Sequence, residues 1–500
     1  MKITNNQVVA LSDIERLTYT DFFMQVSNAL SSDAAHCVSY FALPEGGEEY
    51  TLICYIANDE SHDVELFAAK VSKTEELQSL TAQYLALHPF EREIYEQYAL
   101  NFVGHPWLKP LRYSHDRQTG GDIYDYPFYQ IDSPELHRVG VGPIHAGIIE
   151  PGHFRFICEG EKIHHLEIQL GWQHRGIENL FVEKKKLLQR ATLAENIAGD
   201  TVVGHSTAFV NATEALAGWE APEWLQIERA IALEQERIAI HTGDLSAICT
   251  DVAYQLGNAV FGRLRTPMIN YLQKWCGSRF AKSLIRPFKT NFLFTEALAK
   301  DWEETISKYL PHFTEMAEQM FDLPSVLSRI ERTGVVPTQT AQTIGLVGMA
   351  GKASGLSRDV RASHPWGAYK TLNYEPVVMQ SGDVYARAQM RYKEILKSIQ
   401  LIRDLIAKRR ALGEQQKIEN PQTKWEAKAD SIVLSMTEGW RGMICHVAVT
   451  GADGDLRAYK IADPSVHNWL GLALAVRENG ISDFPICNKS FDLSYCGHDL

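Results

Sequence analysis

The segment EWLQIERAIALEQERIAIHTGDLSAICTDVAYQL, residues 223–256, decides the fold class of this chain. Its apolar residues recur at the spacing of one buried helix face, and they are Ile227, Ile231, Ile238, Leu245, Ile248 and Val252. A second stripe within 383–412 consists of Tyr392, Ile395, Ile399, Ile402 and Ile406. A basic KRR before Gly413 suits the end of that second helix. The sequence therefore predicts a domain built on long helices.

Shorter segments on either side of these helices predict strands. HFRFICEGEKIHHLEIQL (153–170) alternates apolar and polar residues around a Glu-Gly turn, which indicates a β-hairpin. GMICHVAVTGADGDLRAYKIA (442–462) predicts a second hairpin. Nearer the start, YTLICYIA (50–57) is strand-like, and KTEELQSLTAQYLALHP (73–89) predicts a helix with Leu77, Leu80 and Tyr84 on one face. Pro89 and the run HPWLKP are expected to interrupt regular structure.

These segments define the expected fold class and domain organisation. The polar stretch HDRQTGGDIYDYP is typical of an interdomain linker or of a strap over a partner. We therefore expect an α+β protein with a small α+β domain over residues 1–113 and a linker over 114–137. A helix-rich domain with peripheral β-hairpins is expected over 138–500.

Composition limits the possible functions. The 500 residues carry a formal net charge of −13, which argues against a nucleic-acid partner. No run approaches eighteen apolar residues, so no membrane-spanning helix is expected. The polar, acidic first twenty residues do not resemble a signal peptide. No strand–glycine-loop–helix fingerprint for a dinucleotide is found, so NAD is not expected to bind here.

The cysteines do not show the spacing of a thiolate metal site. They lie at positions 37, 54, 158, 249, 276, 445, 487 and 496, with no Cys-x-x-Cys pair. Most are expected to be small buried residues in a reducing compartment. Cys487, Cys496 and His498 leave a zinc site open as an alternative, although zinc ligands usually lie closer together in sequence.

Several motifs in order carry a resemblance to a known family. HPFEREIYEQYALNFVGHPWLKPLRY resembles the small hydrophilic subunit beside the quinone-site subunit of respiratory complex I. From about residue 138 the chain resembles the large subunit of energy-converting, membrane-bound [NiFe] hydrogenases of the formate hydrogenlyase type, and its complex I relative. That second resemblance rests on GPIHAGIIEPGHFRF, LGWQHRGIE, LEQERIAIHTGDL, GDVYARAQMRYKEI and YKIADPSVHNW. It implies a fused subunit that spans nearly the whole chain.

The resemblance implies a metal site whose ligands this chain lacks. The family holds nickel and iron with four cysteines on two turns, because thiolates stabilise these metals. The matching positions in this sequence are Ala198, Thr201, Ser465 and Asn468, whereas His205 and the pair Asp463-Pro464 are kept. We therefore expect that the hydrogenase fold is retained and that no metal is bound.

The complex I relative implies quinone as a ligand of the same region. That family uses a Tyr on the first turn, and this position falls near Ala198 and Gly199. His145 and His153 flank the loop that supplies the family's quinone-binding His, and either could take its place. The quinone hypothesis is thus weakened but stays open.

Other ionisable residues are candidates for proton transfer. Glu150 matches the glutamate with which hydrogenases pass protons from the metal; a salt-bridged loop residue is the alternative. Glu234, Arg237, His241 and Asp244 form a titratable stripe on the 223–256 helix, as a relay or as a structural ion-pair network.

The arginines and a short turn motif complete the candidate residues. The resemblance places Arg358, Asp359, Arg361 and Arg441 around the active-site cavity or near the iron–sulfur partner; the alternative is that they hold Asp463 and other carboxylates. It places His174 and Arg175 near the partner's closest cluster, although these two residues also suit the cap of a turn.

Two functions follow. The first is a peripheral large subunit at the cytoplasmic face of the inner membrane, which couples electron transfer to ion translocation without a [NiFe] centre. Its expected partners are a small iron–sulfur subunit, a ferredoxin-like subunit and antiporter-like membrane subunits, and the iron–sulfur clusters belong to these partners. The second is a non-catalytic pseudo-hydrogenase scaffold. An open cavity lined by Glu150, His205 and Asp463 would favour the first, and a collapsed one the second.

Overall fold

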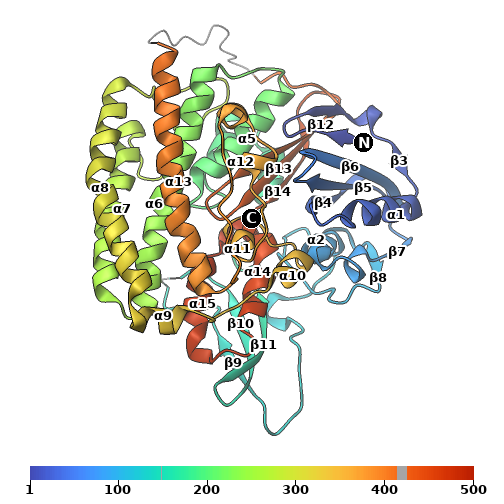
Figure 1. Cartoon of the computed structure of the whole chain (residues 1–500). Coiled ribbons are helices and arrows are strands. Elements are labelled where there is room, and N and C mark those ends of the chain that lie inside the picture. The colour runs from blue at the N-terminus through green and yellow to red at the C-terminus, as the bar shows by residue number, and fades with distance from the viewer. Residues whose placement is uncertain (148, 414–424) are drawn as a thin grey trace.

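A computed structural model describes residues 1–147, 149–413 and 425–500 of the chain. It contains an N-terminal mixed sheet, a central antiparallel sheet and a layer of long helices (Figure 1). The α+β fold class is confirmed. Among the described residues, no helix combines the length and the apolar character needed to cross a bilayer.

The N-terminal region is built on a five-stranded sheet in the order β1-β6-β5-β4, with β3 parallel to β6. Helix α1 packs on this sheet, and α2 packs on β4. The elements are β1 (Lys2–Ile3), β3 (Arg16–Leu17), α1 (Tyr19–Leu30), β4 (Ala35–Gly46), β5 (Glu49–Asn58), β6 (Asp63–Ser72), β7 (Glu76–Gln78), α2 (His88–Tyr98) and β8 (Asn101–Val103). Strand β5 confirms the strand predicted at 50–57.

The helix predicted over 73–89 is wrong. Residues Glu76–Gln78 form β7, which pairs in parallel with β8, and two 3-10 turns follow. The cause is Glu91, whose buried carboxylate accepts hydrogen bonds from the Leu80 and Thr81 amides and holds the chain in turns. Pro89 does not stop regular structure, because it occupies the first turn of α2, where a missing N–H costs nothing.

The central sheet joins the two ends of the chain. Its order is β14-β13-β12-β2, from β2 (Val8–Ala10), β12 (Ser431–Glu438), β13 (Met443–Thr450) and β14 (Leu456–Ala462). The second predicted hairpin forms as β13 and β14, and every residue of β12 and β13 is buried, so the first strand of that hairpin lies inside the protein. On β12, Ile432 and Leu434 pack with the N-terminal sheet, whereas Val433 packs with the helical core.

Long helices cover the other side of this central sheet (Figure 1). They are α6 (Glu223–Asp251), α7 (Gln255–Cys276), α8 (Glu296–Asp322) and α13 (Val384–Ala411), and α6 packs against both α7 and α13. Helices α6 and α13 confirm the two long helices predicted from the apolar stripes. Helix α5 (Val202–Leu216) lies directly on β12 and β13.

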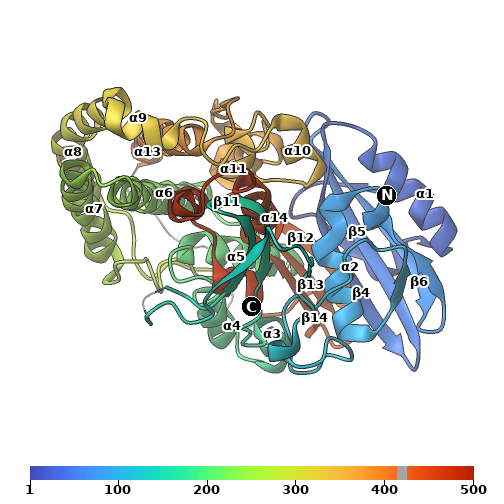
Figure 2. The ribbon, with the colours of Figure 1, turned by 90° about the horizontal axis from the view of Figure 1, so that it is seen from below.

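A third sheet, in the order β11-β10-β9, contains the first predicted hairpin (Figure 1), and Figure 2 shows its strand β11 beside α14. Its strands are β9 (His137–Val141), β10 (His153–Glu159) and β11 (Lys162–Gln169). The shorter helices are α3 (Ile177–Glu183), α4 (Leu187–Ala194), α9 (Pro324–Ile330), α10 (Thr338–Thr343), α11 (Gly348–Ala353), α12 (Val360–Ser363), α14 (Pro464–Ala475), α15 (Phe484–Phe491) and α16 (Tyr495–Asp499). The 3-10 turns are η1 (Leu11–Asp13), η2 (Leu80–Ala82), η3 (Leu85–Leu87), η4 (Ile123–Asp125), η5 (Gly367–Thr371) and η6 (Ile481–Asp483).

Candidate functional site

The first turn of the candidate site lies between α4 and α5. Ala198 and Thr201 are both 1% exposed. The Thr201 hydroxyl donates to Asp200 Oδ1 at 3.0 Å and accepts from Trp440 Nε1 at 3.1 Å. Arg441 donates to both carboxylate oxygens of Asp200, each at 2.7 Å, and its guanidinium lies 3.9 Å from the centroid of the Trp440 ring. Other protein groups therefore bind the polar side chains of this turn and cover it.

The second turn opens helix α14. Ser465 and Asn468 are 0% and 1% exposed, respectively. The Ser465 hydroxyl accepts from the Ser494 amide at 2.9 Å. The Asn468 side chain accepts from the Val347 amide at 3.1 Å and donates to the Val347 carbonyl at 3.2 Å. Both side chains thus hold neighbouring segments of the chain.

The two turns are joined by a buried hydrogen-bonded chain. His205 Nε2 lies 3.0 Å from Asp463 Oδ2, His205 Nδ1 lies 3.1 Å from His446 Nε2, and His446 Nδ1 lies 2.8 Å from the Tyr459 hydroxyl. One proton arrangement satisfies all three contacts: Tyr459 donates to His446, His446 to His205, and His205 to Asp463. The structure thus brings the predicted residues His205 and Asp463 into direct contact, in a chain that continues to His446 and Tyr459.

The electrostatics agree with this arrangement. Burial lowers the pKa of His446 well below its ordinary value, which keeps that ring neutral. Burial alone would raise the pKa of Asp463, but the hydrogen bond from His205 and the nearby charge of Arg441 lower it to about 2. Asp463 also accepts the Ser465 amide at 2.8 Å as the N-cap of α14. The Asp463 carboxylate is therefore ionised, and it accepts hydrogen bonds from His205 and from the Ser465 amide.

The donor set does not fit a nickel–iron pair. A carbon side chain at 198 supplies no ligand, and the neutral oxygens of Thr201, Ser465 and Asn468 are hard donors already bonded to protein. Within the described parts of the chain, no three His, Cys, Asp or Glu side chains converge as a metal site. Cys487, Cys496 and His498 are among these described residues and form no such group.

Other predicted residues lie on the loop before β10 or at the start of that strand and make contacts of their own. His145 Nε2 lies 2.8 Å from the Gly152 carbonyl, and His153 Nδ1 lies 3.0 Å from the Gly142 carbonyl, so both rings bind their own loop. Glu150 is half-buried and accepts from the Tyr495 amide at 3.3 Å. Burial, with Glu150 nearby, raises the pKa of the Cys496 thiol to about 12. Glu150 therefore contacts the C-terminal tail.

The predicted stripe on α6 is part of a larger buried ion network. Arg237 Nε lies 3.2 Å from Glu234, and His241 Nε2 lies 2.9 Å from Glu394. Asp244 pairs with Arg391 at 2.8 Å. The network's central members, from separate segments of the chain, are Glu234, Arg237, Lys352, Asp359, Arg361, Glu394 and Glu438. All of these are at most 2% exposed.

Lys352 is the centre of this network. Its Nζ lies 2.7 Å from Asp359, 2.5 Å from Glu394 and 3.5 Å from Glu438. Three cations face four carboxylates in the network, and burial together with Asp359 raises the pKa of Glu438 above its ordinary value. A proton on Glu438 balances the charges. Arg361, predicted either near the cavity or as a partner of carboxylates, bonds Asp359 and Glu234.

The remaining predicted residues have structural contacts of their own. Arg358 approaches Asp59 of the N-terminal region at 4.0 Å and donates to the Leu346 carbonyl. His174 Nδ1 lies 2.9 Å from the Asp499 carbonyl. Arg175 donates to the carbonyls of Asn196 and Ile197, directly before Ala198, and to that of Cys496. His174 and Arg175 thus tie the first turn to the C-terminal tail.

Sequence reasoning missed several members of both clusters. Arg387, Arg391, Glu394 and Ser398 recur on α13 at spacings of four, three and four, a polar stripe that could have been recognised. No comparable signal marks Lys352. His446 follows the alternation of a buried strand, which does not distinguish a hydrogen-bonded His from an apolar residue.

Comparisons with known proteins agree with the order of the motifs. Residues 16–120 match the family model of the 30 kDa subunit of respiratory-chain NADH dehydrogenase, and residues 256–499 match that of its 49 kDa subunit. Hydrogenase-4 component G of Escherichia coli (strain K12) is 26% identical over 480 residues, which cover 92% of this chain and 80% of that protein.

Two further relatives are similar over most of their length. Formate hydrogenlyase subunit 5 of Escherichia coli (strain K12) is 27% identical over 431 residues, 81% of this chain and 74% of that protein. The C/D subunit of the NADH-quinone oxidoreductase of Phocaeicola vulgatus is 27% identical over 353 residues, 63% of this chain and 67% of that protein.

Proposed function

Since this chain fuses the 30 kDa-type and 49 kDa-type regions of complex I and is homologous to the large subunits of hydrogenase-4 and formate hydrogenlyase, we propose that it works as the peripheral large subunit of a membrane-associated redox complex. In this proposal the complex couples electron transfer to ion translocation, and the chain itself holds no [NiFe] centre.

One observation carries the second half of the proposal. The four positions that match the family's cysteines hold Ala198, Thr201, Ser465 and Asn468, all almost fully buried. The three polar side chains among them bind protein groups rather than point at a common centre. Soft metals need thiolates, and rebuilding such a site would require both new donors and the loss of these hydrogen bonds.

The names of the relatives support a place in a multisubunit complex. One of them is named as the alpha subunit of a membrane-bound hydrogenase, and others are named as the C/D subunit of NADH-quinone oxidoreductase. We propose a small iron–sulfur subunit, a ferredoxin-like subunit and antiporter-like membrane subunits as partners, at the cytoplasmic face of the inner membrane. The iron–sulfur clusters would belong to these partners.

Within this proposal, His205 and Asp463 are the residues best placed to hold or move a proton. They are in direct contact and fully buried, and the chain continues through His446 to Tyr459. Glu150 would relay protons only after a change of its loop, because its carboxylate now binds the Tyr495 amide. An electron acceptor such as a quinone would also have to displace the loop contacts of His145 and His153, or the ion pairs of Arg361 and Arg441.

A second candidate function is a pseudo-hydrogenase scaffold. The observation that favours it is the dense packing between the two turns, where Arg441 and Trp440 cover the first turn and Asp463 and Ser494 bind Ser465. The two roles differ in what happens when the buried chain is changed. A scaffold needs His205 and Asp463 only for assembly, whereas a redox role needs them for turnover.

The test is to isolate the native complex through a tag on this chain. We expect iron–sulfur and membrane subunits to co-purify, with iron but no nickel. A preparation free of such subunits would contradict the proposal. The variant His205→Gln then separates the two roles: loss of electron transfer in a fully assembled complex supports coupling, and unchanged electron transfer supports the scaffold.

A further inference from the structure

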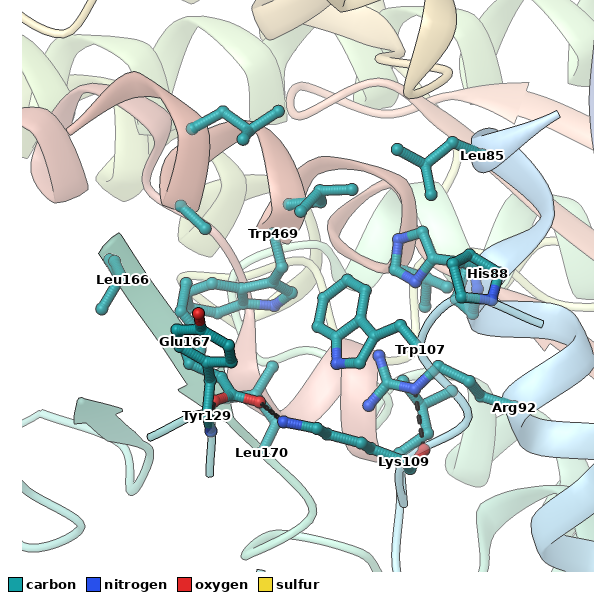
Figure 3. Close-up of a pocket in the computed structure, with 18 of the residues that line it drawn as sticks. Leu85, His88, Arg92, Trp107, Lys109, Tyr129, Leu166, Glu167, Leu170 and Trp469 are labelled. Atoms are coloured by element: carbon teal, nitrogen blue, oxygen red, sulfur yellow. Dashed lines mark hydrogen bonds and ion pairs between the residues drawn. The ribbon is translucent and has the colours of Figure 1, made fainter. Parts of the chain in front are cut away.

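A cavity of about 460 Å³ lies where the N-terminal region meets the second domain (Figure 3). Its walls come from α2 and the segment 104–111 on one side, and from β11 and α14 on the other. Its volume falls within the range of small-molecule sites in proteins. None of the four matched ligand positions lines it.

The walls are mainly apolar, and two tryptophans dominate them. Trp107 comes from the 104–111 segment and Trp469 from α14. His88 stacks on Trp107 with centroids 5.0 Å apart and planes at 18°, and the Arg92 guanidinium lies 4.6 Å from the Trp107 centroid. These contacts fix the Trp107 ring in place, so the cavity presents a preformed aromatic surface.

Two buried polar atoms of the wall have no partner in the described part of the protein. They are Nδ1 of His88 and Nε1 of Trp469, and each side chain belongs to a residue that is 5% exposed. An indole N–H can only donate, and burying it without an acceptor is costly. A bound molecule that supplies an acceptor atom would remove this cost.

The charge of the lining is positive, although the whole protein carries −13. Lys109 reaches across to pair with Glu167, as Figure 3 shows. Arg92 donates to the carbonyls of Lys109 and Pro110, and Arg477 approaches only His165. Among the described residues, neither arginine has a carboxylate within ion-pair distance. Two guanidinium groups are therefore left without an anion.

Burial keeps the histidines of this lining from adding charge. It lowers the pKa of His88, His165 and His498. At neutral pH these rings are therefore uncharged, and the excess positive charge comes from the arginines alone.

We propose that this cavity binds an amphipathic anion, a molecule with one acidic headgroup and an apolar body. The body lies against Trp107 and Trp469, and the headgroup is held by Arg477 at the exposed side and by Arg92. At about 30 Å³ per heavy atom the space admits roughly fifteen heavy atoms. The cavity shares helix α14 with the second turn, but none of the four matched positions lines it, and the inference does not depend on the proposed redox role.

The test uses the full-length chain and naphthalene-2-sulfonate, a fluorescent aromatic anion small enough for this cavity. We expect one probe per chain and its displacement by decanoate. Decanol, of similar length but neutral, should displace it roughly tenfold less effectively, since charge-assisted hydrogen bonds are lost. Equal displacement by decanol and decanoate would show an apolar groove without an anion site and would overturn the proposal.

Variants assign the binding to this cavity. Arg477→Gln changes an exposed side chain and should weaken decanoate roughly three- to fivefold, as for a charge pair at an exposed rim, while decanol stays unchanged. Arg263→Gln changes an exposed arginine on α7, far in sequence from Arg477, and is the matched control. It should change neither decanoate nor decanol binding. Ala473→Trp fills the cavity from α14 and should abolish probe binding. Probe binding that survives this filling overturns the proposal.

Two further arms identify the source of the anion. Displacement by decanoate but not by phosphatidylglycerol vesicles identifies a free acid, and displacement by the vesicles identifies a lipid chain; both support the site. The same titration is repeated on the native complex. If the complex binds no probe while the isolated chain does, a partner segment covers the cavity and the proposal is wrong.

Discussion

The substitution Lys352→Met tests whether the buried ion network is held by its central cation. Methionine keeps most of the side-chain volume but removes the charge that faces Asp359, Glu394 and Glu438. Removing one partner from a buried ion pair typically costs ~3–5 kcal/mol, since the remaining charges stay buried without compensation. At ~2 °C per kcal/mol, the midpoint of thermal unfolding should fall by roughly 6–10 °C.

A matched control and a compensating change sharpen this test. Lys274→Met removes a lysine whose ion pair with Asp301 is largely exposed, and it should cost less than ~1 kcal/mol. Adding Glu394→Gln to Lys352→Met removes one carboxylate as well and restores the charge balance. The double variant should therefore be at least ~1 kcal/mol more stable than the sum of the single effects predicts. Unfolding is followed by circular dichroism.

A midpoint of thermal unfolding for Lys352→Met within ~2 °C of that of the Lys274→Met control would show that Lys352 does not hold the network together. Strict additivity in the double variant would show that the network does not act as one charge-balanced unit.

Three further predictions concern groups near the two turns. Burial raises the pKa of Glu236 to about 8, although the hydrogen bonds from the Val203 and Gly204 amides act in the opposite direction. The protonated Glu236 therefore stabilises the fold below pH 4.5, and this contribution is lost as the pH rises through 8. Glu236→Gln should flatten the pH dependence of the unfolding free energy between these limits, by up to ~1.4 kcal/mol per pH unit; an unchanged slope contradicts this. The pKa of Asp463 is lowered to about 2, so its stabilising effect is present above pH 3.8 and is lost as the pH falls through 2. Asp463→Asn should cost ~2 kcal/mol at pH 7 and almost nothing at pH 2, measured by urea unfolding, and an equal cost at both values would refute the linkage. Cys496 is the one cysteine that is not fully buried, so alkylation followed by mass spectrometry should label it before the seven others, and earlier labelling of Cys487 would contradict the packing of the tail.

The long helices and the hairpins could be predicted because their signals are local. The stripes from Ile227 to Ile248 and from Tyr392 to Ile406 repeat within single segments, and α6 and α13 follow them closely. Residues 73–89 carry an equally helical spacing, yet only His88 and Pro89 are helical, as the start of α2, and the rest of the segment contains a short strand and turns. The deciding contact comes from Glu91, outside that segment, so periodicity alone could not reveal it.

Contacts between distant residues could be predicted only in part. The motifs marked His205 and Asp463, but their shared partner His446 lies on a strand without a distinctive pattern. The absence of thiol side chains at the four positions matched to the family's cysteines could be read directly from residue identity. The side chains that surround these four positions could not be predicted, because Arg441 and Asp200 lie 241 residues apart and meet only in the folded chain. Strand β2 shows the same limit: three residues near the start complete a sheet formed near the end.

Elemental analysis of the native complex, purified through this chain with its partner subunits identified in the same sample, shows whether the complex works without a [NiFe] centre. We expect iron from the partners' clusters and no nickel above background. One nickel per chain, retained after dialysis against a chelator, would contradict this expectation, because the side chains at 198, 201, 465 and 468 provide no thiolate to hold that metal.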